Sequence, residues 1–203
     1  MQRILFSLAL VVASLALPFH GATAQTNINA SLVQPDAGFE KYNKFMIRPL
    51  EIDETVLVPP PWIEGSEGKP RPWNISEKNA RFLQKQYHAA MKKQLEELGG
   101  YTLVETADDD VLAVEIEIIS LTPWAKPEDK VVTKGSGEIT FRAEVRDSMT
   151  RDLLVMYEGE TPVGEDYQEH TEFSVDQNVT ALFNQWGEFL RQGLDSQKSA
   201  TAN

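Results

Sequence analysis

Two segments of this chain alternate between apolar and polar residues, and this period of two constrains the fold more than any other feature. Every second residue of Val111–Leu121 and Glu138–Arg146 forms one apolar face, made of Leu112, Val114, Ile116, Ile118, Ile139, Phe141, Ala143 and Val145. Because successive side chains of a strand point to opposite faces, each segment is predicted to be a strand with one buried face. The polar run Asp147–Asp152 favours a tight turn. Leu153–Tyr157 is then predicted to return as the partner strand of a hairpin.

A helical period of three to four residues precedes these strands. Asn74 or Ser76 can act as the N-cap of this helix, and Gly99–Gly100 can end it because glycine adopts the left-handed conformation without strain. The apolar stripe of the predicted helix consists of Ala80, Leu83, Tyr87, Met91, Leu95 and Leu98. Such spacing is typical of an amphipathic helix that packs one face on a core.

A second helical stripe lies near the end of the sequence. Ser174 and Gln177 form a capping-box pattern that predicts its start, and Gly193 is predicted to end it. The stripe consists of Val175, Val179, Leu182, Phe183, Trp186, Phe189 and Leu190. A broad apolar face of this kind must be buried against another element.

The remaining segments complete the predicted order β-α-β-β-β-β-α. Phe45–Leu50 is predicted to be a first strand and Tyr101–Val104 a short one, whereas the Pro- and Gly-rich segment Val56–Trp73 is predicted to be a long loop. Strands with one solvent-exposed face, accompanied by two amphipathic helices, favour the α+β class. We therefore predict a single layer of mostly antiparallel sheet with two helices packed on one face.

The first residues have the pattern of a secretory signal peptide. Arg3 supplies a positive charge, Ile4–Leu17 is almost entirely apolar, and Ala22–Ala24 provides the small residues that signal peptidase requires. The apolar run is short for a membrane span. Cleavage is therefore predicted after Ala24, which would place the mature protein in the periplasm or outside the cell.

These signals divide the chain into four predicted parts. Residues 1–24 are the cleaved signal peptide, and residues 25–40 are polar without a period, which predicts a flexible lead-in. Residues 41–195 are predicted to form a single α+β domain, followed by a polar tail at 196–203. The length is ordinary for one domain that buries a core of its own.

The composition limits the classes of function. The chain has no cysteine, so it needs no disulfide and offers no lipid-attachment site after the signal; a soluble mature protein without a transmembrane anchor is expected. Its 31 acidic residues against 19 Lys and Arg give a net charge of −12. Nucleic-acid binding needs a basic surface and is therefore not expected.

Several segments also resemble a known family, the domain-of-unknown-function 3313 family of the bacterial envelope. The resemblance rests on Leu95–Tyr101 (LEELGGY), Asp110–Glu115 (DVLAVE) and Ala143–Leu154 (AEVRDSMTRDLL), and it extends roughly over residues 45–190. It implies an α+β envelope domain and no established activity. Two departures stand out, since many members carry an acylated cysteine that this chain lacks, and Arg151 stands where the family turn often has glycine.

Few residues have a pattern typical of catalysis. With no cysteine and no paired histidines, neither a transition-metal site nor a cofactor site is predicted. The run Asp108–Asp110 lacks the spacing of a calcium loop and is interpreted as a solvated turn. A second acidic group near the start of the last helix complements the helix dipole and consists of Asp166, Glu169 and Glu172, together with His170. No catalytic residue is predicted.

Three tryptophans in proline-bearing loops, Trp62, Trp73 and Trp124, are the candidate binding residues. A large rigid aromatic side chain either buries much area or anchors a partner. The main hypothesis is a non-enzymatic binding or assembly-accessory protein of the envelope, whose partner is an envelope protein or a cell-wall glycan. A periplasmic hydrolase that uses acidic residues and a small-ligand carrier are the alternatives.

Overall fold

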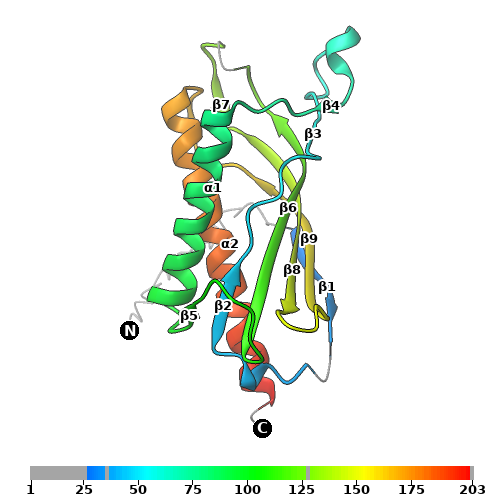
Figure 1. Ribbon diagram of the computed structural model, residues 1–203. Coiled ribbons are helices and arrows are strands. Elements are labelled where there is room, and N and C mark those ends of the chain that lie inside the picture. The colour runs from blue at the N-terminus through cyan, green and yellow to red at the C-terminus, as the bar shows by residue number, and fades with distance from the viewer. Residues whose placement is uncertain (1–26, 35–36, 127–128, 202–203) are drawn as a thin grey trace, which may run out of the picture.

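A mixed, mostly antiparallel sheet and two long helices make up the fold. The computed structural model describes residues 27–34, 37–126 and 129–201, so the predicted signal peptide at 1–24 lies outside the described residues. The main sheet has eight strands (Figure 1), of which six form the path β1 (Asn27–Val33), β9 (Leu153–Pro162), β8 (Gly137–Asp147), β6 (Val111–Pro123), β2 (Lys44–Ile47) and β5 (Thr102–Leu103). The predicted α+β class is confirmed.

The hairpin of β8 and β9 and the long pairing of β6 with β8 confirm the strands predicted from the period of two. Ile116 lies opposite Ala143 and Ile118 lies opposite Phe141, and all four side chains are buried. The other face of these strands carries charged residues, with Glu117 opposite Arg142. One face of the hairpin therefore contributes to the core and the other meets solvent.

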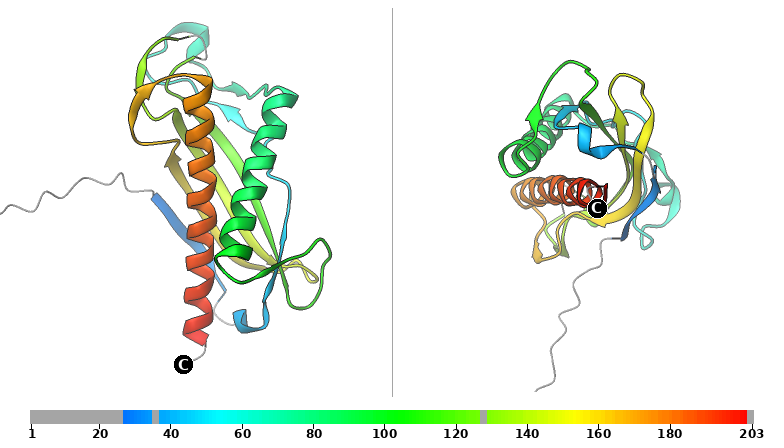
Figure 2. Two further views of the ribbon diagram at one scale, coloured as in Figure 1. Left: turned by 90° about the vertical axis from the view of Figure 1, so that its left-hand side faces the viewer. Right: turned by 90° about the horizontal axis from the view of Figure 1, so that it is seen from below.

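Both predicted helices are present and lie side by side in all views (Figures 1 and 2). Helix α1 spans Glu77–Met91 and continues as the π-helical segment η3 (Lys92–Glu97). Of the two N-cap candidates, Ser76 fills the role, because its Oγ accepts a hydrogen bond from the N–H of Asn79. Helix α2 spans Glu172–Thr201.

The core lies between the helices and the sheet. Its buried residues form one cluster that joins α1, η3 and α2 to the apolar face of β6, β8 and β9. Aromatic rings cross this cluster: the ring centroids of Phe141 and Trp186 lie 4.4 Å apart, and Phe183 contacts both Trp186 and Tyr87. Only non-covalent contacts hold the elements together, because the chain has no cysteine to form a disulfide.

The predicted lead-in at 25–40 is wrong for much of its length. Asn27–Val33 forms strand β1, which pairs antiparallel with β9 at the edge of the sheet, and Phe39–Lys41 is a short 3₁₀ turn whose Phe39 is buried. The sequence of β1 carries the period of two that indicates a strand, because the apolar Ile28, Ala30 and Leu32 alternate with polar residues.

The predicted boundaries of the second helix also need correction. Its N-cap is Thr171 rather than Ser174, because Thr171 Oγ1 accepts from the N–H of Ser174 while Ser174 Oγ accepts from the N–H of Thr171. The helix also continues through Gly193 into the predicted tail. A Cβ at Gly193 would lie 2.7 Å from the hydroxyl of Tyr157, so this glycine gives room for close packing and does not end the helix.

The predicted loop Val56–Trp73 contains regular structure. Strand β3 (Val56–Leu57) pairs with β6 and with β4 (Arg71–Pro72). The 3₁₀ turn η2 (Gly65–Gly68) lies between β3 and β4 in the chain. Two further strands, β7 (Val132–Lys134) and β10 (Tyr167–Glu169), form a separate two-stranded sheet. Strands of two or three residues are too short to show a period.

Candidate functional site

One end of the molecule carries η2, β7 and the start of α2 (Figures 1 and 2). Trp62 is 62% exposed there, and its ring centroid lies 5.8 Å from that of the half-buried Trp124. The structure therefore brings together two of the three predicted tryptophans from loops 62 residues apart. Trp73 does not join them, because its half-buried side chain packs against the core.

The loops that carry this pair are fixed by specific contacts. The N–H of Trp124 donates to the carbonyl of Ser136 over 3.1 Å, and the N–H of Trp73 donates to the carbonyl of Thr55 over 2.9 Å. Lys126 and Glu67 form an ion pair at 3.0 Å that connects η2 to the segment after β6. The two rings are thus presented on an ordered support, which lowers the entropy cost of binding.

The small sheet of β7 and β10 adds further apolar side chains to the same end. Val132 lies opposite Glu169 and Lys134 lies opposite Tyr167, so Val132 and Tyr167 share one face, and both are exposed. Val131, directly before β7, and Phe173, shortly after β10, are exposed as well. We call Trp62, Trp124, Val131, Val132, Tyr167 and Phe173 the apical surface.

The apical surface holds five of the eight large hydrophobic side chains that are exposed among the described residues. Single exposed apolar residues are common, but a concentration of them at one place marks interaction sites. The sequence alone did not point to Val131, Val132, Tyr167 or Phe173. Their only signal was the presence of apolar residues in otherwise polar segments.

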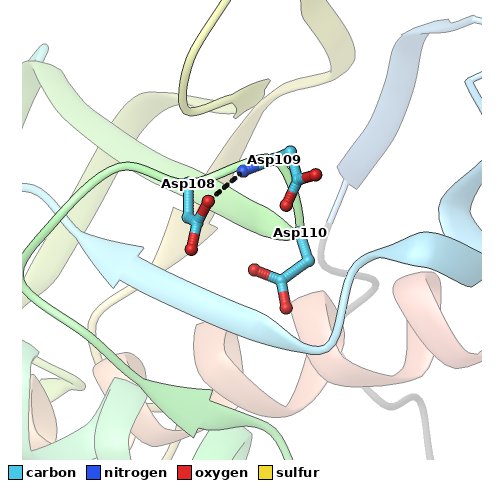
Figure 3. A group of neighbouring side chains, drawn as sticks. All are labelled: Asp108, Asp109 and Asp110. Carbon is cyan, nitrogen blue, oxygen red and sulfur yellow. Dashed lines mark hydrogen bonds between the residues drawn. The ribbon is translucent and has the colours of Figure 1, made fainter.

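The run Asp108–Asp110 is the one group of three possible metal ligands found among the described residues, with ligand atoms within 4.8 Å of one another (Figure 3). However, Asp108 Oδ1 already accepts a hydrogen bond from the N–H of Asp109, and Lys44 Nζ lies 2.8 Å from Asp110 Oδ2. The hydrogen bond to Asp110, more than any other contact, raises the pKa of Lys44. A metal ion would have to displace this ammonium group.

Several acidic residues on the solvent face of the sheet are paired with arginine. Glu117 bonds Arg142, while Glu115 lies 3.5 Å from Arg146 and 2.6 Å from Arg151. Burial and then the neighbouring Glu160 raise the pKa of Glu138 on the same face. A glycoside hydrolase needs an acid and a base that face each other across a cleft, and the groups paired with arginine are poorly suited to either role.

The turn between β8 and β9 contains Arg151 at the position where the family often has glycine. Arg151 has a φ of +66°, the one positive φ outside glycine in the described part of the chain. A residue with a Cβ is strained in that conformation, so glycine is the residue expected there. The guanidinium of Arg151 compensates through its contact with Glu115 at 2.6 Å.

Comparison of the sequence with known families gives one match. Residues 21–190 match the family described as "Protein of unknown function (DUF3313)". The chain belongs to this family. The resemblance inferred from its motifs is thereby confirmed, and no activity is established for this DUF3313 protein. Comparison with curated proteins finds no match.

Several solved structures show a distant similarity. A DUF330 family protein from Xanthomonas campestris is 9% identical, with 85% of this chain and 96% of that chain covered and a TM-score of 0.46. The PelC dodecamer from Paraburkholderia phytofirmans is 8% identical, with coverages of 82% and 98% and a TM-score of 0.41. A DUF4136 family protein from Bacteroides thetaiotaomicron is 11% identical, with coverages of 83% and 96% and a TM-score of 0.38. These similarities carry no functional information.

Proposed function

We propose that this DUF3313 protein is an exported, non-enzymatic binding protein that contacts another protein of the cell envelope through its apical surface. The observation that carries the proposal is the exposure of Trp62 beside Trp124, at the end where the other exposed apolar side chains gather. Tryptophan and tyrosine are enriched among the residues that dominate protein–protein binding. Export is inferred from the signal-peptide pattern of residues 1–24.

The apical surface suits a protein partner better than a glycan. Its two tryptophan rings are tilted by 38° to each other, so they do not form one flat platform for a sugar ring. Val131, Val132 and Phe173 extend the surface with aliphatic and aromatic groups. A mixture of this kind buries apolar area against an apolar partner surface, and a glycan would leave most of it unused.

We also infer that the sheet forms a single layer with both helices on one face. In that arrangement the helices and the core occupy one side, and the charged face and the two ends stay available for contacts. No helix among the described residues is long and apolar enough to cross a membrane.

The alternative functions have less support. A carrier that encloses an apolar ligand needs an internal cavity, but the cavity between the sheet and α2, lined by Phe141, Tyr157 and Trp186 among others, measures only about 20 Å³. That volume is about enough for one water molecule. For a hydrolase, Glu138 is the one carboxyl among the described residues whose pKa is raised, and it lies on the open face of the sheet.

Site-specific photocrosslinking in the cells that produce the protein tests the proposal. A photoreactive residue replaces Trp62 or Tyr167 at the apical surface, and in controls it replaces Leu98 or Met149. These controls are 59% and 61% exposed. They belong to the end of η3 and the turn between β8 and β9, segments that lie at the opposite end of the molecule (Figure 1). We expect the same discrete protein adduct from both apical positions and none from the controls. The variant Trp62→Ala should reduce the adduct formed at Tyr167.

Two results would contradict the proposal. Equal crosslinking from both ends, or none from the apical end, would show that this surface has no specific partner. Retention of the purified protein on cell-wall glycan, lost in Trp62→Ala, would assign the surface to the glycan instead. Because Trp62 is exposed and its main contact is Trp124, its replacement should change the free energy of unfolding by only about 1 kcal/mol, so lost binding would not reflect unfolding.

A further inference from the structure

An open groove with a basic lining runs between α1 and the segment that follows β2. Its volume is about 610 Å³, within the range of ligand sites. Nine residues line the groove; four of them are basic and none is acidic, the full set being Ile47, Arg48, Pro49, Gln84, Lys85, Tyr87, His88, Ala89 and Lys92. In a chain with a net charge of −12, such a local excess of positive charge requires an explanation.

The helix and the neighbouring segment place these basic side chains on opposite walls. Lys85, His88 and Lys92 are spaced by three and four residues and therefore lie on one stripe of the helix. The other wall carries Arg48, and the segment after β2 runs alongside α1 in the views of Figures 1 and 2. Gln84 connects the two walls through two hydrogen bonds to Leu50. Gln84 Oε1 accepts from the N–H of Leu50 over 2.9 Å, and Gln84 Nε2 donates to the carbonyl of Leu50 over 2.6 Å.

The cations of the groove are poorly compensated. Within the described parts of the chain, neither Arg48 nor Lys85 has an ion pair, and Lys92 has a single contact with Glu96 at 3.7 Å. Some basic residues elsewhere are paired closely, as in Lys44 with Asp110 and Lys78 with Glu172, both at 2.8 Å. The wall also includes Tyr87, whose buried hydroxyl has no hydrogen-bond partner.

We propose that this groove binds a compact anion that carries a phosphoryl group. Arginine and lysine on facing walls provide the donors and the charge that phosphate oxygens require. We infer a compact ligand because interactions between charges in solution are screened beyond about 8 Å. Only an anion inside the groove is close enough to be attracted by its basic side chains. An extended polyanion would reach beyond the groove over a protein whose net charge is −12, and it would be repelled. A soluble phosphomonoester and a phospholipid headgroup share this chemistry.

Titration of the purified protein with inorganic phosphate and with glycerol phosphate, followed by the amide NMR shifts, tests the proposal. Sodium chloride keeps the ionic strength constant. We expect saturable shifts confined to the groove, at residues 47–50 and 84–92. The double variant Lys85→Gln with Lys92→Gln should weaken binding about tenfold through the loss of two charged contacts. The matched control is Lys78→Gln with Lys93→Gln, on the same helix segment but outside the groove, and it should bind like the unchanged protein.

Vesicles distinguish the two sources of phosphate. Binding to vesicles of phosphatidylglycerol, but not of phosphatidylcholine, that is lost in the Lys85→Gln and Lys92→Gln variant would assign the groove to a lipid headgroup. Binding of glycerol phosphate without vesicle binding would assign it to a soluble ligand. Shifts that also appear with chloride alone, that do not saturate, or that are the same in both double variants would overturn the proposal. None of these results depends on the apical surface.

Discussion

Asp147 gathers four hydrogen-bond donors at the turn between β8 and β9. Its carboxylate accepts from Tyr42 Oη at 2.7 Å, from Lys41 Nζ at 3.3 Å, and from the N–H groups of Met149 and Thr150, both at 2.9 Å. Burial alone would raise the pKa of Asp147, but the hydrogen bonds from Thr150, Tyr42, Met149 and Lys41 outweigh it and lower the pKa to about 2. The ionised carboxylate therefore stabilises the folded state.

The first prediction concerns the pH dependence of this contribution. In the unfolded chain the carboxyl of Asp147 is protonated near its usual pKa of 3.8, and in the folded protein only near about 2. As the pH falls below the pKa of the unfolded state, the unfolded chain binds more protons than the folded protein. The ionised Asp147 therefore contributes its full stabilisation of about 2 kcal/mol above that pKa, and this stabilisation is lost as the pH falls to about 2. Asp147→Asn should lower the free energy of unfolding at neutral pH by about that amount.

Denaturant unfolding at several pH values checks this prediction. The difference in stability between the unchanged protein and Asp147→Asn should shrink between pH 3.8 and about 2. Asp152→Asn, in the same turn but exposed, is the control and should show a small difference at every pH. A difference for Asp147→Asn that is independent of pH would contradict the assigned role.

Residue types alone did not separate the three loop tryptophans. Trp62, Trp73 and Trp124 all stand near proline in polar segments. In the structure Trp62 is exposed, Trp73 packs on the core, and Trp124 is half-buried. Burial depends on which distant segment covers a side chain, and that information is not local. Similarly, the spacing of Lys85, His88 and Lys92 is visible in the sequence, but the position of Arg48 opposite them is not.

At the scale of elements, the small sheet of β7 and β10 depends on a close approach of two backbone segments. The N–H of Gly135 donates to the carbonyl of Asp166 over 2.9 Å, and the N–H of Ser136 donates to that of Val163 over 2.7 Å. Gly135 has a φ of +69°, and a Cβ there would lie only 2.1 Å from the carbonyl oxygen of Gly164. Both its conformation and its surroundings therefore require glycine.

The second prediction separates these two requirements. Gly135→Ala should destabilise the protein by about 2–4 kcal/mol, because strain at positive φ and a backbone clash add together. Gly100→Ala is the matched control, since Gly100 has a φ of +71° and a Cβ there would meet nothing within 4 Å. It should cost only about 1–2 kcal/mol. Equal losses, measured by denaturant unfolding, would mean that the close approach has no energetic effect.

Element types were more predictable than element ends. The stripes of α1 and α2 and the alternation in β6 and β8 follow from the period of the chain, because each element buries one face. The end of α2 does not follow from the period, because a contact with the distant Tyr101 stabilises the residues after Gly193. Its hydroxyl donates to Asp195 over 2.9 Å, and Lys198 Nζ lies 4.1 Å from the centre of its ring.

At the scale of the whole molecule, one cluster of buried residues joins the helices to the sheet. The Asp147 turn and the Gly135 segment lie at opposite ends of β8, and the strand between them contributes Phe141 and Val145 to this cluster. A chain with a single core should unfold in one cooperative step, and this expectation also tests the single predicted domain at 41–195.

The third prediction follows from that continuity. Asp147→Asn and Gly135→Ala should both shift the same transition, with the calorimetric and van't Hoff enthalpies of unfolding equal in each variant. Reducing agents should have no effect, because the chain has no cysteine. Two separate transitions, each sensitive to only one of the substitutions, would show that the two ends of the sheet unfold independently.

The sequence by itself determined the α+β class, the principal helices and long strands, and the net negative charge of the chain. These properties are local or additive: a period sets which face of an element is buried, and charges sum over the chain. Only the tertiary structure decided that β1 pairs with β9, that Trp62 meets Trp124, and that Arg48 faces the basic stripe of α1. Each of these joins residues far apart in the chain, and their meeting depends on how the packed elements fit together.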